Sequence, residues 1–350
     1  MKNSNAYESI LEMYEGKPFK TSKVADTLIE VLRFQFTPEE AELAVKVGLK
    51  GGKLDQIQER TGIEKNKLKK MLNTMADKGT MWISPGIEDP TYQTIGVAGP
   101  GLLETGGWGN VRFPHSIQLL KALYTFQLDF AKNILGEMPF SVAQVWTTPA
   151  ALPDDAEPNE DVAKKIKEAG YWGVSTCSCR LPHWVADPGN HCEHLLETCL
   201  FMSDMAHWGV EHGICREITY DEVLEILRKC NEDGLVHTYD PNDFICNCCP
   251  DCCVLQIGAR EPGAKVLEPS AFVAQVDDST CNSCNTCADC CPFGAIEVNA
   301  HALVDKNKCL GCGVCFPTCS TDSIHFVRRP KAEEPSLETV ASYVKSRLFP

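Results

Sequence analysis

The first 176 residues contain no cysteine, although the 350-residue chain has 20 of them. No apolar run approaches the roughly 18 residues that a membrane-spanning helix needs, and the N-terminal segment lacks the basic-then-apolar pattern of an export signal. No GxGxxG or P-loop pattern follows a strand-like segment, so nucleotide and flavin binding lack support. We therefore expect a cytoplasmic protein without a membrane span.

The cysteines that are present lie in two regions. Eleven occur between Cys177 and Cys253, and nine between Cys281 and Cys319. Disulfide frameworks are typical of small secreted domains, whereas this chain is large and shows no export signal. In a reducing compartment, such a density of cysteine indicates metal ligands or redox chemistry.

The chain also lacks a basic excess. Its net charge is −15, yet residues 1–95 balance, with 14 basic and 14 acidic side chains. The remaining residues carry 19 basic and 34 acidic side chains, so the deficit coincides with the cysteines. An acidic surface repels nucleic-acid phosphates and favours a basic redox partner protein.

Residues 1–99 predict a winged-helix-like domain within an α+β protein. Thr37 and Pro38 are typical of a helix start, and a second helix begins near Lys53. A third helix has apolar residues at helical spacing, and strand-like segments follow at 81–83 and 92–97. The third helix carries the lysines that would contact DNA, Lys65, Lys67, Lys69 and Lys70. The balanced charge of this domain instead favours a packing or protein-contact module.

A connecting segment is expected over residues 100–155, with a helix at 116–135 and a Pro-rich, acidic linker at 149–161. Beyond a boundary near 155 we expect a mixed cysteine-rich middle domain, 156–268, and a bacterial ferredoxin-like domain, 269–328. A helical tail is expected over residues 329–350.

The C-terminal cysteines repeat one spacing twice. Three cysteines lie three positions apart, and a fourth follows four positions later. Three thiolates so spaced can bind three corners of one cubane, while the fourth reaches the other cluster. We therefore expect two [4Fe–4S] clusters, one on Cys281, Cys284, Cys287 and Cys319, the other on Cys309, Cys312, Cys315 and Cys291. Zinc is disfavoured because zinc sites usually use two separated pairs. Cys290 is a spare thiol.

The middle domain offers nine further candidate metal ligands: Cys177, Cys179, Cys192, Cys199, Cys246, Cys248, Cys249, Cys252 and Cys253. Nine thiols exceed the needs of one tetrahedral metal, so one or two additional iron–sulfur clusters are expected. A structural zinc, or a mixture of inert buried cysteines, is the alternative. His183, His191 and His194 are nearby candidates, although each alone is more often structural. Cys215 and Cys230 lie in amphipathic helical stretches and are interpreted as core residues.

Several segments together carry a resemblance: LDQIQERTGI, MADKG, TCSCR, GVEHGICREIT, GLVH, ICNCCPDCC and the C-terminal double motif. On these, most of residues 37–328 resembles 4Fe–4S dicluster-domain proteins of anaerobes that have an N-terminal winged-helix-like region. The resemblance implies an accessory electron-transfer component of a larger oxidoreductase complex, with no defined substrate. Two other hypotheses stay open. One is a redox-sensing transcription regulator, and the other is an oxidoreductase with an open iron position in the middle domain.

Overall fold

The computed structural model describes residues 4–14, 24–96, 108, 115–137, 141–157, 160–240, 243–261 and 263–330. Helices and strands both contribute substantially, so the predicted α+β class is confirmed. Nearly all of the expected C-terminal tail, 329–350, lies outside the described residues. In the described part of the chain, no helix is both long and apolar enough to cross a membrane.

The described residues of the N-terminal region form five helices and a small sheet. The helices are α1 (Ser4–Met13), α2 (Ala25–Gln35), α3 (Pro38–Val47), α4 (Leu54–Thr61) and α5 (Lys65–Asp77). Strands β1 (Gly52–Lys53), β2 (Met81–Ile83) and β3 (Thr91–Thr94) pair antiparallel in the order β1-β3-β2. Thr37 begins α3 as expected, because its hydroxyl accepts from the Glu40 N–H while the Glu40 carboxylate accepts from the Thr37 N–H.

This N-terminal sheet packs against the body of the molecule. The Trp82 ring of β2 lies 5.4 Å from the Trp208 ring, and the Asp77 carboxylate lies 2.8 Å from Nδ1 of His212. Both partners belong to or directly follow α10 (Ser203–Glu211). The hairpin that would form a wing is therefore partly covered by the neighbouring region.

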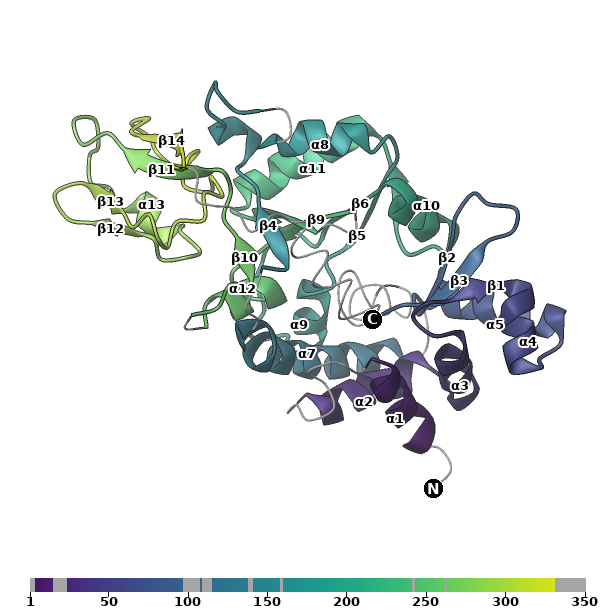
Figure 1. The fold of residues 1–350 in the computed structure, drawn as a ribbon. Helices are drawn as coiled ribbons and strands as arrows, with labels where there is room; N and C mark the ends of the chain where they lie inside the picture. The colour runs from purple at the N-terminus through teal and green to yellow at the C-terminus, as the bar shows by residue number, and fades with distance from the viewer. Residues whose placement is uncertain are drawn as a thin grey trace.

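A seven-stranded sheet forms the middle of the molecule (Figure 1). Its order is β10-β4-β8-β9-β6-β5-β7, antiparallel except for the β10–β4 pair. The strands are β4 (Ala143–Val145), β5 (Trp172–Thr176), β6 (Glu197–Met202), β7 (Arg216–Ile218), β8 (Val236–Asp240), β9 (Phe244–Cys248) and β10 (Leu267–Glu268). Strand β4 comes from the expected connecting segment, so the sheet uses residues on both sides of the boundary expected near 155.

Helices cover both faces of this sheet (Figure 1). One face packs against α8 (Val162–Glu168) and α11 (Tyr220–Glu232) through a separate apolar cluster. The other lies toward α7 (Ser116–Asn133), α9 (Arg180–Ala186) and α12 (Val254–Ala259), and its core includes several cysteines. Short 3-10 turns occur at Leu135–Glu137 and Pro149–Ala151. Cys177, which follows β5, and the cysteines of β6 and β9 thus face a helical layer.

The C-terminal lobe consists of two strand pairs and a short helix. Strand β11 (Phe272–Val276) pairs with β14 (Ile324–Arg328), and β12 (Ile296–Val298) pairs with β13 (Ala302–Val304). Helix α13 spans Thr286–Asp289. The acidic segment expected as a linker is held against this lobe, because the Arg328 guanidinium donates to the Asp155 carbonyl at 2.8 Å and to the Glu160 carboxylate.

Candidate metal centres

The two C-terminal cysteine loops begin with the same turn. The Asp277 carboxylate accepts from the Ser279 N–H at 2.9 Å, and the Asp305 carboxylate accepts from the Asn307 N–H at 3.0 Å. The carbonyls of these aspartates then accept from the N–H groups of the first cysteine of each loop, at 3.1 and 2.9 Å. The sequence repeat is therefore also a repeat of backbone geometry.

Both loops also turn through the left-handed backbone region at matching positions. Ser283 and Asn285 have φ of 60° and 69°, and their counterparts Gly311 and Gly313 have φ of 73° and 87°. The second loop needs glycine at the first of these positions, because a Cβ on Gly311 would lie 2.1 Å from the Phe272 carbonyl oxygen. In each loop, these turns allow three cysteines to lie within one short segment.

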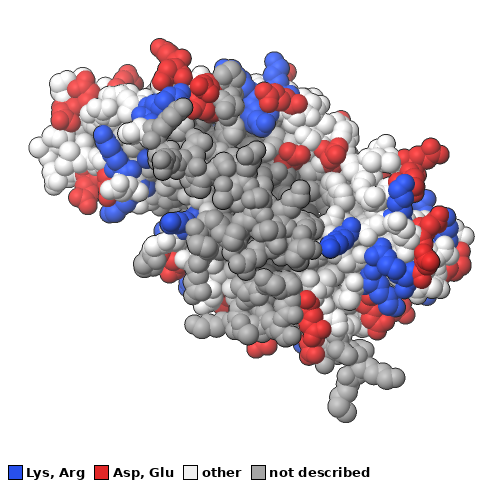
Figure 2. Space-filling model, in the orientation of Figure 1, with Lys and Arg blue, Asp and Glu red and all other residues white. Residues whose placement is uncertain are grey.

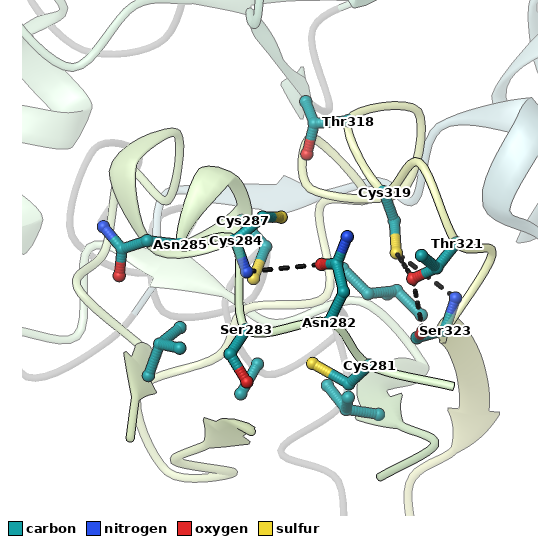
Figure 3. Close-up of a pocket in the computed structure, with 14 residues that line it drawn as sticks. Cys281, Asn282, Ser283, Cys284, Asn285, Cys287, Thr318, Cys319, Thr321 and Ser323 are labelled. Atoms are coloured by element: carbon teal, nitrogen blue, oxygen red, sulfur yellow. Dashed lines mark hydrogen bonds between the residues drawn. The ribbon is translucent and has the colours of Figure 1, made fainter. Parts of the chain in front are cut away.

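One cavity is lined by the four thiols predicted for the first cluster (Figure 3). These are Cys281, Cys284 and Cys287 of the first loop and Cys319 of the second half. The cavity encloses about 320 Å³, open solvent at its mouth included. The lining thiols come from both halves of the repeat, so the cavity brings four potential ligands together at one place.

Hydrogen bonds favour the ionised form of two of these thiols. The hydroxyl and the N–H of Thr286 lower the pKa of the Cys284 thiol. Burial opposes ionisation of Cys319, but the N–H groups of Thr321 and Ser323 outweigh it and lower its pKa. The Ser323 N–H lies 3.2 Å from the Cys319 sulfur, and the Ala295 N–H lies 3.3 Å from the Cys291 sulfur. Thiolate is the form that binds metal.

The four thiols predicted for the second cluster also lie close together. They are on the side of the lobe that contacts the middle domain. Burial, with smaller contributions from the neighbouring thiols of Cys291, Cys309 and Cys290, raises the pKa of Cys312 to about 12. Burial also raises the pKa of Cys315, and the same thiols, together with Cys312, contribute to this shift. Cys290 thus lies beside this group. The Cys312 carbonyl accepts from the Thr148 N–H at 3.0 Å, which ties the loop to the segment that follows β4.

Six of the nine middle-domain cysteines form a closed ring of interacting thiols, which we call the six-thiol group. In ring order it consists of Cys177, Cys179, Cys253, Cys248, Cys246 and Cys199. The strand order brings these segments together, because β6 lies between β5 and β9. Cys199 of β6 is paired with Ser175 of β5, close to Cys177. Cys246 and Cys248 alternate with Asn247 along β9 and so share one face of the sheet.

The other three predicted ligands, Cys192, Cys249 and Cys252, form a separate three-thiol group. Their sulfurs all lie within 4.8 Å of one another, at 3.8 Å for Cys192–Cys249 and 3.5 Å for Cys192–Cys252. All three are buried. The Cys252 thiol and N–H, together with the Arg180 charge, hold the pKa of Cys249 at about 5 against the effect of burial. These close cysteine groups could bind metal.

Arg180 lies beside both middle-domain groups and was not identified from the sequence. Its side chain is fully buried and donates to two uncharged acceptors, the Asn247 carbonyl oxygen and the Thr198 hydroxyl. Burial disfavours its charge, but the thiols of Cys177, Cys249 and Cys199 outweigh this and raise its pKa. The signal available in the sequence was an arginine directly after a cysteine pair, in TCSCR.

The histidine candidates do not join the three-thiol group. His183 packs edge-on against Tyr124, His191 packs on Trp184, and Nδ1 of His194 lies 3.2 Å from the Asp233 carboxylate. Cys230 is fully buried on α11, as expected of a core residue. Cys215 was predicted to lie in a helix, but α10 ends at Glu211. Cys215 is only partly buried and lies in the turn before β7.

Comparisons with known proteins give no relative for this chain: no family model, curated protein or solved structure matches it. The assignment of function therefore depends on the residues and their geometry.

Proposed function

We propose that this protein is an iron–sulfur electron carrier that relays single electrons to or from a partner oxidoreductase. In this proposal the C-terminal lobe is a bacterial ferredoxin-like unit that holds two [4Fe–4S] clusters on the eight cysteines named above. Such clusters supply one-electron redox chemistry. The main support is the cavity that four thiols from both halves of the repeat line together.

The different exposure of the two loops gives the proposed relay a direction. Cys284 is exposed to solvent, whereas Cys312, at the same position of the second loop, is only partly so. The Gly311 carbonyl next to Cys312 accepts from the Thr147 hydroxyl at 2.7 Å, and the loop packs on the core that contains Cys248. The first loop therefore faces an external partner, and the second faces the middle domain.

The six-thiol group extends this proposal into the middle domain, as the place for an additional iron–sulfur cluster. Its thiols come from strands β6 and β9, from the turn after β5 and from the N-terminal ends of α9 and α12, and most are buried. Burial and hydrogen bonds to cluster sulfurs are the main means by which a protein sets cluster potentials. The Arg180 N–H donates to the Cys177 sulfur at 3.5 Å, and the charge of its guanidinium acts on Cys177 and Cys199.

The surface charges favour a protein partner over nucleic acid. On the face shown in Figure 2, acidic and basic side chains alternate around α4 and α5, and no uniformly basic face is visible. Lys65 of α5 is paired with Asp55, and Trp82 of the hairpin packs on Trp208. We therefore propose that the winged-helix-like domain is a contact module, and that the carrier acts in the cytoplasm of an anaerobe.

Reduction kinetics with a small low-potential viologen test the relay. We expect reversible one-electron reduction of anaerobic protein, followed by low-temperature EPR. Cys284→Ala, at the exposed loop, should slow the reduction of the remaining clusters, because the entry point is removed. The matched Cys312→Ala variant should lose the EPR signal of the second-loop cluster. The cluster of the first loop should still be reduced at the original rate. Cys215→Ala is the control and should change neither rate nor signal.

A wild-type protein with no reversible one-electron reduction would rule out the carrier function. Equal reduction rates in the two loop variants would contradict the direction of the relay.

A further inference from the structure

The three-thiol group has the spacing of ligands on one metal ion. A tetrahedral ion with metal–sulfur bonds of about 2.3 Å places its sulfurs about 3.8 Å apart. The sulfurs of Cys192 and Cys249 are 3.8 Å apart, and those of Cys192 and Cys252 are 3.5 Å apart. Thiolates on a [4Fe–4S] cluster bind different irons and therefore lie farther apart. The distances indicate a single ion.

The local chain supports this geometry. Cys249 and Cys252 bracket Pro250 and Asp251 in a tight turn, where the Cys252 N–H donates to the Cys249 sulfur at 3.3 Å. A C-x₂-C pair combined with a ligand from a distant segment is a common pattern of zinc sites, and a set of three protein ligands leaves the fourth position of the tetrahedron open. Cys192 supplies that third ligand from the segment between α9 and β6.

The buried charge of Arg180 is compatible with a negatively charged metal site next to it. Arg180 is fully buried, it donates to the Asn247 carbonyl oxygen and the Thr198 hydroxyl, and its Nε has no hydrogen-bond partner among the described residues. A buried charge is costly without a counter-charge. A divalent ion on three thiolates has a net charge of about −1, opposite to that of the guanidinium. The guanidinium interacts with the thiols of Cys177 and Cys199 in the six-thiol group as well as with Cys249 of the three-thiol group, so it offsets negative charge on both.

We propose that Cys192, Cys249 and Cys252 bind one zinc-type divalent ion, separate from any cluster in the six-thiol group or the C-terminal lobe. In the described part of the chain, no fourth cysteine, histidine or carboxylate joins the group, so a non-protein ligand completes the tetrahedron. The nine middle-domain cysteines then serve two centres of different chemistry. This centre does not depend on the electron-carrier function.

Elemental analysis of the whole chain, purified anaerobically from zinc- and iron-supplemented cells, tests the proposal. We expect about one zinc per chain in the wild type. Cys192→Ser and Cys249→Ser should each lose this zinc, while iron, sulfide and the C-terminal EPR signals stay unchanged. Cys230→Ala is the matched control, because Cys230 is equally buried in the same apolar cluster but outside the three-thiol group, and it should keep the zinc.

Cobalt substitution supplies a second readout. A Co²⁺ ion in the wild-type site should give the visible absorption of tetrahedral thiolate coordination, absent from Cys192→Ser. Zinc retained in both serine variants, or iron and sulfide lost together from Cys192→Ser, would overturn the proposal. Loss of zinc from Cys230→Ala would contradict the three-thiolate ligand set. The unchanged C-terminal EPR signals separate these outcomes from misfolding and from failure of the electron-carrier proposal.

Discussion

At the scale of single residues, Asn247 organises the interior between the two middle-domain groups. Its side-chain amide donates to the Thr198 carbonyl at 2.6 Å, and its own carbonyl accepts from Arg180 at 3.0 Å. Its side-chain oxygen lies 2.6 Å from Nδ1 of His237. One buried asparagine therefore fixes an arginine through its backbone carbonyl and a histidine through its side chain, next to the cysteines of β9.

His237 is held neutral by this arrangement. Because the Asn247 amide nitrogen donates elsewhere, its oxygen accepts from His237, so Nδ1 carries the proton. Nε2 is buried without a hydrogen-bond partner among the described residues. Burial lowers the pKa of His237 to about 4. Protonation would place an unpaired charge in the core.

Because of His237, we expect the free energy of unfolding to fall in acid. The unfolded chain binds the proton near pH 6.5, whereas the folded chain binds it only near pH 4, so stability is full above about pH 6.5 and falls between these values. The expected loss is about 3 kcal/mol, at 1.36 kcal/mol per pH unit. His237→Gln should remove this part of the pH dependence in denaturant unfolding. Parallel loss in wild type and variant would show that another group is responsible.

At the scale of elements, the second cysteine loop depends on one glycine. A side chain on Gly311 would meet the Phe272 carbonyl oxygen and the Ser270 hydroxyl at 2.1 and 2.2 Å, in addition to its φ of 73°. The first loop carries Ser283 at the same position with φ of 60°. The two loops therefore have the same backbone path but different surroundings.

Two single substitutions, each introducing the residue of the other loop, test this difference. Gly311→Ser should displace Cys309 and Cys312 and lower the iron content by about four per chain, the content of one cluster. Ser283→Gly should keep all iron, because glycine adopts this conformation without strain. Iron and sulfide analysis with EPR checks both. Full iron content in Gly311→Ser would show that the loop adapts to the added side chain.

The sequence was informative where ligands lie close together along the chain. The C-terminal spacing predicts which cysteines share a loop, and the structure places Cys319 with the first loop because the halves pair through β11 and β14. The division of the middle cysteines could not be predicted, because it depends on the placement of β6 between β5 and β9. Cys192 lies outside any strand, so no register indicated its neighbours.

At the scale of the whole molecule, the cysteine groups lie in continuous packing. The second C-terminal loop and the six-thiol group share one apolar core, and Arg180 lies between the six-thiol and three-thiol groups. The segment expected as a linker is instead bound to the C-terminal lobe by Arg328. The acidic charge accompanies these regions, in keeping with a basic protein partner.

The most direct test of the central claim is the quantification of iron and acid-labile sulfide, with low-temperature EPR, on anaerobically purified protein. We expect at least about eight irons per chain and signals from two reduced [4Fe–4S] clusters that depend on the C-terminal cysteines. Iron near zero, or zinc or disulfides at those eight cysteines, would contradict it.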